Sequence, residues 1–189
     1  YPVLVIENTE LADQYRSGAY KPLSTEQAIT YCAFLKEWFE EHNIEVIRTG
    51  LQSSEELDSG NSLISGPYEP AMGELVVNEQ YKQRIEMCID EHFSSKRCLE
   101  NQYTYHISPS VNHYSHKVEC RTHANNTNKL AKHKILISYP RNLTSKVRGL
   151  KNRNILYFQE TYPQFSIEWC EDSTRNTVRC CIDGLQYVL

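Results

Sequence analysis

Apolar residues in the first hundred positions follow two kinds of pattern. Residues 3–6, VLVI, form a continuous run rich in β-branched side chains, which predicts a strand buried on both faces of a parallel sheet. Residues 44–51, IEVIRTGL, have the same character and predict a second strand. Residues 24–41 lie between them and place apolar side chains on one face of a helix, at Ile29, Cys32, Ala33, Leu35 and Phe39. A strand, a helix and a strand in this order predict a βαβ unit with parallel strands and a right-handed crossover.

Polar residues mark the ends of this helix. Ser24 can cap its first turn, and Gln27, three residues later, can complete a capping box. His42 and Asn43 end the helix before the second apolar run. Further along, the Gly- and Pro-rich loop SGPYEPAMGELV, residues 65–76, opens into another helix that is expected to continue to about Phe93.

The C-terminal part of the chain predicts a small domain with the order β, α, α, β, β. Residues 134–140, KILISYP, predict a strand that Pro140 ends. Two short helices follow, the first with Asn142 or Thr144 as a cap and Gly149 at its end, the second ending before Pro163. Residues 165–171 and 176–182 then alternate as two strands separated by the turn-forming residues DSTRN.

These patterns predict three regions in the 189 residues: an α/β domain over residues 1–100, a polar hairpin or linker over 101–128, and a small α+β domain over 129–189. No stretch approaches the roughly 18 apolar residues of a membrane span, and the first residues given lack the basic-then-apolar layout of a signal peptide. We therefore expect no membrane partner and a cytoplasmic location. Because Tyr1 leads directly into an apolar strand, we also expect a fragment of a longer protein whose remainder is its partner.

The charge is divided along the chain. Residues 1–100 hold 18 Asp and Glu against 8 Lys and Arg, whereas residues 120–159 hold no acid and nine Lys or Arg. An acidic region followed by a basic one favours a polyanionic partner such as nucleic acid for the second region. The alternative is a solvated basic face that only balances the acidic region.

Histidines and cysteines offer one candidate metal site. His113-x-x-His116 followed by Cys120-x-x-His123, with His106 nearby, has a spacing compatible with structural zinc. The alternation in YTYHI and HKVEC instead favours a polar β-hairpin, which we prefer, so we assign no metal ligands. The seven cysteines are an odd number without any CxxC, a pattern that suits buried thiols in a reducing compartment.

The ends of the two predicted strands carry polar side chains that could meet a ligand, because parallel sheets bind ligands at their carboxyl edge. Glu7 ends the first strand, and Arg48 and Gln52 end the second. A cation on an apolar strand needs either a ligand or an ion-pair partner, and Glu7 or Glu45 could serve as that partner.

The segments YPVLVIENTELADQYRSGAYKPL, VIRTGLQ and LISGPYEPAMGELV resemble the later half of bacterial radical S-adenosylmethionine (SAM) proteins similar to the catalytic subunit of Elongator. That family shows Ala and His where this chain has Ser65 and Glu69. The resemblance, over about residues 1–80, implies the end of a partial (β/α) radical-SAM barrel in which Arg48 and Gln52 face cofactor or substrate. It also implies a 4Fe–4S cluster and SAM in the full-length protein, whereas this chain lacks the CxxxCxxC motif and alone binds neither cofactor.

The C-terminal order β, α, α, β, β resembles the core of a KH domain, in which a GxxG loop between two helices clamps a single-stranded nucleic acid. Here the loop reads Gly149-Leu150-Lys151-Asn152, with asparagine at the second glycine position. The resemblance implies RNA, with transfer RNA the expected kind, as the partner of one basic turn: Lys146, Arg148, Gly149, Lys151, Asn152 and Arg153. Tyr157 or Phe158 could stack on a base or pack in the core.

The sequence therefore predicts a catalytically inactive C-terminal fragment of an Elongator-like radical-SAM enzyme, which completes the barrel and binds RNA. Two alternatives stay open. The C-terminal domain could be a lid or a protein-interaction domain of a radical-SAM enzyme acting on a small molecule, as in coproporphyrinogen-oxidase-like enzymes. The chain could also be a zinc-stabilised structural module centred on residues 113–123.

Overall fold

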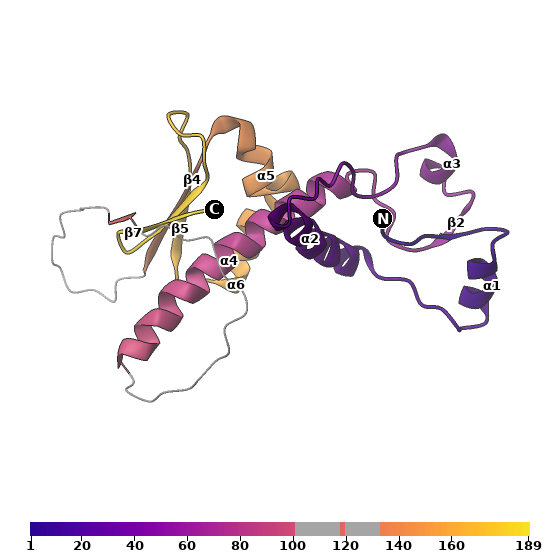
Figure 1. Cartoon of the computed structure of the whole chain (residues 1–189), viewed down its shortest axis with the longest axis horizontal. Coiled ribbons are helices and arrows are strands. Elements are labelled where there is room, and N and C mark those ends of the chain that lie inside the picture. Colours follow the sequence, from indigo (N-terminus) through magenta and orange to yellow (C-terminus); the bar gives the residue numbers. More distant parts are fainter. Residues whose placement is uncertain (101–117, 120–132) are drawn as a thin grey trace. The chain divides into compact units, whose positions relative to one another are not determined.

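The computed structural model describes residues 1–100, 118–119 and 133–189 (Figure 1). The chain divides into two compact units, Tyr1–Gln80 and Tyr81–Leu189. The elements of the first unit are β1 (Val5–Ile6), α1 (Glu10–Arg16), α2 (Thr25–Glu41), α3 (Glu55–Asp58), β2 (Leu63–Ser65) and the start of α4 (Met72–Glu100). The rest of α4 belongs to the second unit, followed by β3 (Val118–Glu119), β4 (Lys134–Tyr139), η1 (Arg141–Leu143), α5 (Thr144–Arg148), η2 (Leu150–Asn152), α6 (Arg153–Thr161), β5 (Ser166–Glu171), β6 (Arg179–Ile182) and β7 (Leu185–Val188).

Helix α2 of the first unit forms where the sequence predicts it. Its first turn carries the expected capping box: the backbone N–H of Gln27 donates to Ser24 Oγ at 3.2 Å, and the backbone N–H of Ser24 donates to Gln27 Oε1 at 3.0 Å. The inner face of the helix buries Ile29 and Ala33 in a small apolar cluster with residues of α4: Met72, Leu75 and Val76. The core of this unit is therefore small.

The predicted parallel βαβ arrangement is wrong for this chain. Residues 44–51 form no strand, and the sheet of the first unit has two short antiparallel strands, β1 and β2, with Val5 paired to Ser65. A parallel strand is stable only between neighbouring strands and under layers that cover both faces. No described strand lies beside residues 44–51, and the side chain of Ile47 is 88% exposed.

A second apolar stripe on α2 faces outward. Tyr31, Phe34, Leu35 and Trp38 recur at the spacing i, i+3, i+4, i+7, and all four are exposed. One helix therefore presents apolar side chains on two faces, while only one face is covered within the described residues. A helix that is apolar on two faces is typical of a position between two layers of a larger structure.

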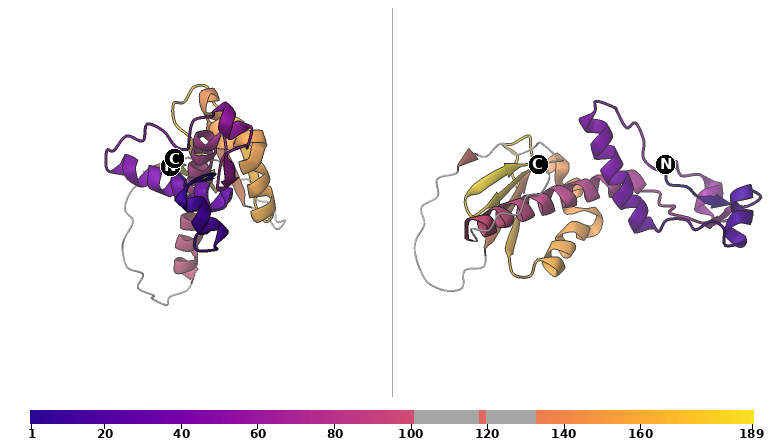
Figure 2. Two further views of the ribbon diagram at one scale, coloured as in Figure 1. Left: turned by 90° about the vertical axis from the view of Figure 1, so that its right-hand side faces the viewer. Right: turned by 60° about the horizontal axis from the view of Figure 1, so that its bottom comes forward.

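The second unit has a five-stranded sheet with the order β3-β7-β6-β4-β5. Strands β4 and β5 are parallel, with Ile137 beside Trp169, and the other pairs are antiparallel. Figure 2 shows β4 to β7 in orange to yellow, with the orange helices α5 and α6 beside them. The predicted order β, α, α, β, β is confirmed by β4, α5, α6, β5 and β6. The last strand, β7, follows a turn at Asp183-Gly184, a dipeptide that commonly forms hairpins.

The core of this unit lies between one face of the sheet and the helices. Alternate residues of β4 are buried there, at Ile135, Ile137 and Tyr139, while the intervening residues face the other side. The helices close the core with Ile85 and Ile89 from α4, Val147 from α5 and Phe158 from α6. Since this core includes α4 from Ile85 onward, most of that helix belongs to the compact unit Tyr81–Leu189.

Two predictions concern residues that are largely or wholly outside the described part. The expected hairpin or linker over residues 101–128 lies outside it, except for β3, which pairs with β7. The candidate zinc ligands also lie outside it: His106, His113, His116, Cys120 and His123. Among the described helices, none combines the length and the apolar character that a membrane crossing requires.

Substitution of Phe158 tests the core of the second unit. Its side chain is fully buried among Tyr162, Trp169 and other core residues, so F158A should lower the free energy of unfolding by about 3–5 kcal/mol. On the same helix Leu156 is 53% exposed, and L156A should change it by no more than about 0.5 kcal/mol. Urea unfolding followed by Trp169 fluorescence in a Trp38→Phe background measures both variants, and equal losses would contradict this core.

Candidate functional site

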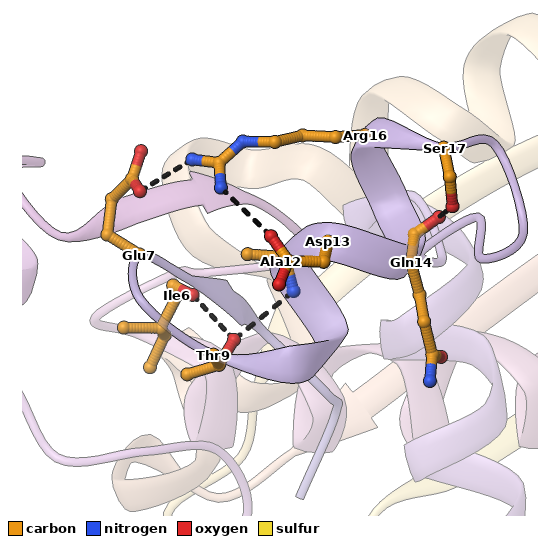
Figure 3. Close-up of polar contacts among 8 residues, drawn as sticks. All are labelled: Ile6, Glu7, Thr9, Ala12, Asp13, Gln14, Arg16 and Ser17. Carbon is orange, nitrogen blue, oxygen red and sulfur yellow. Dashed lines mark hydrogen bonds and ion pairs between the residues drawn. The ribbon is translucent and has the colours of Figure 1, made fainter.

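The end of β1 carries a polar cluster that involves Glu7. Thr9 caps α1 just after this strand: its Oγ1 donates to the carbonyl of Ile6 at 2.7 Å and accepts from the N–H of Ala12 at 3.2 Å (Figure 3). This geometry directs α1 so that Arg16, at its end, reaches back to Glu7, with Arg16 Nη2 at 2.6 Å from Glu7 Oε2. A threonine at the N-cap, Thr9, was the signal that the sequence offered for α1.

Arg16 takes the partner that sequence reasoning offered to Arg48. Hydrogen bonding and charge attraction to Glu7 raise the pKa of Arg16, and Asp13 adds to the effect. Both side chains of the Arg16–Glu7 pair are almost half exposed, so the pair orders the surface rather than contributing much stability. Of the two partners considered for Arg48, Glu7 and Glu45, Glu7 is thus bound to Arg16 instead.

Arg48 and Gln52 lie in the exposed segment beyond α2. Arg48 Nη1 donates to Gln52 Oε1 at 3.4 Å, a long and weak hydrogen bond. Gly50, between them, has φ +81°, and a Cβ built there would lie 2.7 Å from Cβ of Met72. Only glycine therefore lets the backbone at position 50 lie this close to α4. This contact fixes the backbone between Arg48 and Gln52. Arg48 and Gln52 thus lie next to each other, and no function follows from this contact alone.

Glu69 stands where the resembled family carries histidine, and it lies beside the same segment. Its carboxylate Oε1 accepts from the backbone N–H of Ala71 at 3.3 Å, just before α4 begins. It also lines a shallow pocket together with Leu4, Leu51, Tyr68 and Met72. Its observed contact is therefore one that supports the start of a helix.

The basic turn between α5 and α6 is compact. Gly149 has φ +78°, and Lys151 and Asn152 have φ +53° and +61°, so three of four consecutive residues adopt positive φ. The N–H of Gly149 donates to the carbonyl of Ser145 at 3.0 Å, and the N–H of Asn152 donates to the carbonyl of Gly149 at 2.9 Å. Asparagine tolerates the left-handed region better than most residues, which accounts for Asn152 where the motif has glycine.

The turn brings most of the predicted basic residues to the surface. Lys146, Lys151, Asn152 and Arg153 are exposed, while Gly149 is buried. Arg148 differs from the others because it is half-buried beside Tyr139. Burial raises the pKa of that tyrosine, and the nearby guanidinium and its hydrogen bond offset part of the increase. The structure thus presents three basic side chains directly to solvent and holds one against the end of β4.

The aromatic residues of α6 make contacts inside the second unit. Phe158 is fully buried. The hydroxyl of Tyr157 donates to Glu86 Oε1 at 2.5 Å, and the ammonium of Lys82 lies 4.5 Å from the centre of its ring. Of the two functions considered for these rings, packing is therefore the one observed.

No described group of residues fits an iron–sulfur cluster or another metal. Within the described residues, no set of three or more His, Cys, Asp or Glu side chains is placed to hold a metal ion. The cysteines described are free thiols, and burial raises the pKa of Cys88 to about 12 and that of Cys180 well above its ordinary value. Such thiols stay protonated at neutral pH, whereas cluster ligands are thiolates.

Sequence reasoning missed Asn154, which proves central to the turn. Its side chain is only 3% exposed, and its Nδ2 donates to the carbonyl of Val147 at 3.0 Å. The signal available in the sequence was a polar residue inside the apolar pattern of a predicted helix.

Comparison with known families matches the first unit. Residues 1–83 match the family described as the Radical_SAM C-terminal domain. Comparisons with curated proteins and with solved structures give no match. The family implies a 4Fe–4S cluster and SAM in the full-length protein, and the described residues of this chain offer no metal site for that cluster. The match supports the assignment of residues 1–83 to the C-terminal part of a radical-SAM protein.

Proposed function

We propose that this chain is the C-terminal part of an Elongator-like radical-SAM enzyme and that its second unit binds RNA, with transfer RNA as the expected ligand. The observation that carries the proposal is the turn between α5 and α6, where Lys146, Lys151 and Arg153 are exposed around a buried glycine. The first unit completes the barrel that carries the cofactors. In this proposal Arg48 and Gln52 face that cofactor or its substrate.

The local charge supports a phosphate ligand. Residues 120–159 carry nine basic residues and no acid, and the turn lies within them. Clustered Lys and Arg attract the phosphate backbone and release its bound counterions, which makes affinity depend steeply on salt. Arg148 adds its charge from its half-buried position beside Tyr139.

The backbone of the turn supports a close approach by the ligand. Gly149 has no side chain, and the left-handed residues Lys151 and Asn152 produce a tight reversal between the helices. Because Phe158 is buried and the hydroxyl of Tyr157 is bonded to Glu86, we assign base stacking to neither ring. Contacts with phosphate alone supply affinity and orientation but little choice of sequence.

The exposed apolar face of α2 supports the barrel part of the proposal. Phe34 is 62% exposed, and the extended segment that follows α2 exposes Ile44 and Ile47. In a radical-SAM enzyme the remaining strands and helices of the barrel would cover such positions. We propose that this outer face, Tyr31, Phe34, Leu35 and Trp38, packs against the rest of the same polypeptide.

Charge reversal in the turn tests RNA binding by the 189-residue chain. The triple variant K146E/K151E/R153E should bind a fluorescent transfer-RNA transcript at least about tenfold more weakly, since three phosphate contacts become repulsive. The slope of log Kd against log salt concentration should fall by about two. Fluorescence anisotropy at several salt concentrations measures both quantities.

A control compares the single charge reversals K151E and K134E. Lys134 is exposed and pairs with Glu168 of β5 at 2.9 Å. K134E makes the same change in net charge as K151E, so a general field effect would weaken binding equally in both. We expect loss with K151E and a change within about twofold with K134E. Equal affinities for the wild type and the triple variant would overturn RNA binding at the turn.

Substitution of Phe34 tests the barrel interface. In the chain alone, F34S should change the free energy of unfolding by no more than about 0.5 kcal/mol and should reduce self-association, because the ring faces solvent. In a polypeptide that also carries the preceding barrel segments, the same change should cost about 2–4 kcal/mol. Glu41→Ser, at an exposed position on the same helix, is the control. A small effect of F34S in both contexts would contradict the interface.

A further inference from the structure

The unusual backbone of the basic turn needs a side chain that holds it. Lys151 adopts the left-handed region, which β-carbon crowding disfavours for every residue except glycine and, to a lesser extent, asparagine and aspartate. Of the two backbone hydrogen bonds of the turn, one joins Gly149 to Ser145 of α5 and the other joins Asn152 to Gly149, so neither involves a residue of α6. The candidate for a contact from α6 is Asn154, on the first turn of that helix.

Asn154 contacts both sides of the turn. Its Nδ2 donates to the carbonyl of Val147 at 3.0 Å, and Val147 is fully buried in the second core. A Cβ built on Gly149 would lie 3.0 Å from the backbone nitrogen of Asn154 and 3.1 Å from its Cγ and Oδ1. The amide therefore occupies the space beside Gly149, which explains why this position has no room for a side chain.

The contacts of Asn154 are anchored in the protein interior. Phe158, one helical turn later on α6, is fully buried in the same core as Val147. The side chain of Asn154 itself is 3% exposed, so it is shielded from any ligand of the turn. It can affect binding only through the conformation of residues 149–153.

We infer that Asn154 is a positioning residue for the basic turn: its buried amide ties the end of α5 to Gly149 and so holds Lys151 and Arg153 in place to engage adjacent phosphates of one RNA strand. The inference rests on the RNA binding proposed above. The backbone of the turn is then already ordered before RNA binds. Affinity is higher because the turn loses less conformational freedom on binding.

The test measures binding of a transfer-RNA transcript to the full chain carrying N154A. Loss of the donor to Val147 should weaken binding roughly three- to tenfold, although no group that touches RNA has changed. The salt slope should fall as well, because fewer phosphates are neutralised at the same time. Where N154A does not fold, N154S, which keeps a shorter donor, should show the same weakening to a smaller degree.

Two controls separate positioning from general destabilisation. Val178 is 1% exposed in the same core, and V178A should lower stability without changing RNA affinity or salt slope. In a double-mutant cycle, the effect of N154A should shrink in the K151Q background, because the two residues act through one turn. Additive effects, or equal weakening by V178A, would reduce Asn154 to a structural residue and overturn the inference.

The outcomes distinguish this inference from the proposed function. If the triple charge reversal weakens RNA binding while N154A and N154S bind as the wild type does, RNA binding stands and the positioning function is wrong. If neither charge reversal nor N154A changes affinity, RNA binding at the turn fails and the inference fails with it. If the triple charge reversal and N154A both weaken binding, and the effects of N154A and K151Q are not additive, the results support RNA binding and the positioning function of Asn154.

Discussion

Burial of one face of the five-stranded sheet is the constraint on which the second unit depends. Ile135, Ile137 and Tyr139 of β4 can leave water only if α4, α5 and α6 cover them, and Val147 and Phe158 fix two of those helices in place. Once α5 and α6 are held against the sheet, the chain between them must reverse within four residues. The positive φ values at Gly149, Lys151 and Asn152 follow from that requirement.

The first unit lacks a comparable core. Its buried cluster involves few residues, while apolar side chains on α2 and in residues 44–51 remain exposed within the described part. An exposed apolar stripe at helical spacing favours an interaction partner for the first unit, which is the basis of the interface proposed for α2. The family match over residues 1–83 agrees with that reading, because this family is a C-terminal domain of larger proteins.

Local structure could be predicted from the sequence, whereas contacts between distant segments could not. The capping box at Ser24 and Gln27 and the order of β4, α5, α6 and β5 were predictable, because caps and periodicity act between residues close in the chain. The antiparallel pairing of β1 with β2 was not, since it joins distant segments. Residues 44–51 have the composition of a strand, but a strand also needs a neighbour, which composition does not reveal.

For the basic residues of the turn, too, the sequence does not reveal the tertiary contacts of single side chains. Charge and spacing alone placed Arg148 with Lys146, Lys151 and Arg153, yet the structure turns Arg148 toward Tyr139 and leaves the others exposed. Asn154 was invisible as a functional candidate because its importance comes from two contacts, to Val147 and beside Gly149. A cation on a flexible stem loses side-chain freedom when it binds a phosphate, so the rigidity of the backbone that carries it decides how much of the attraction remains as affinity.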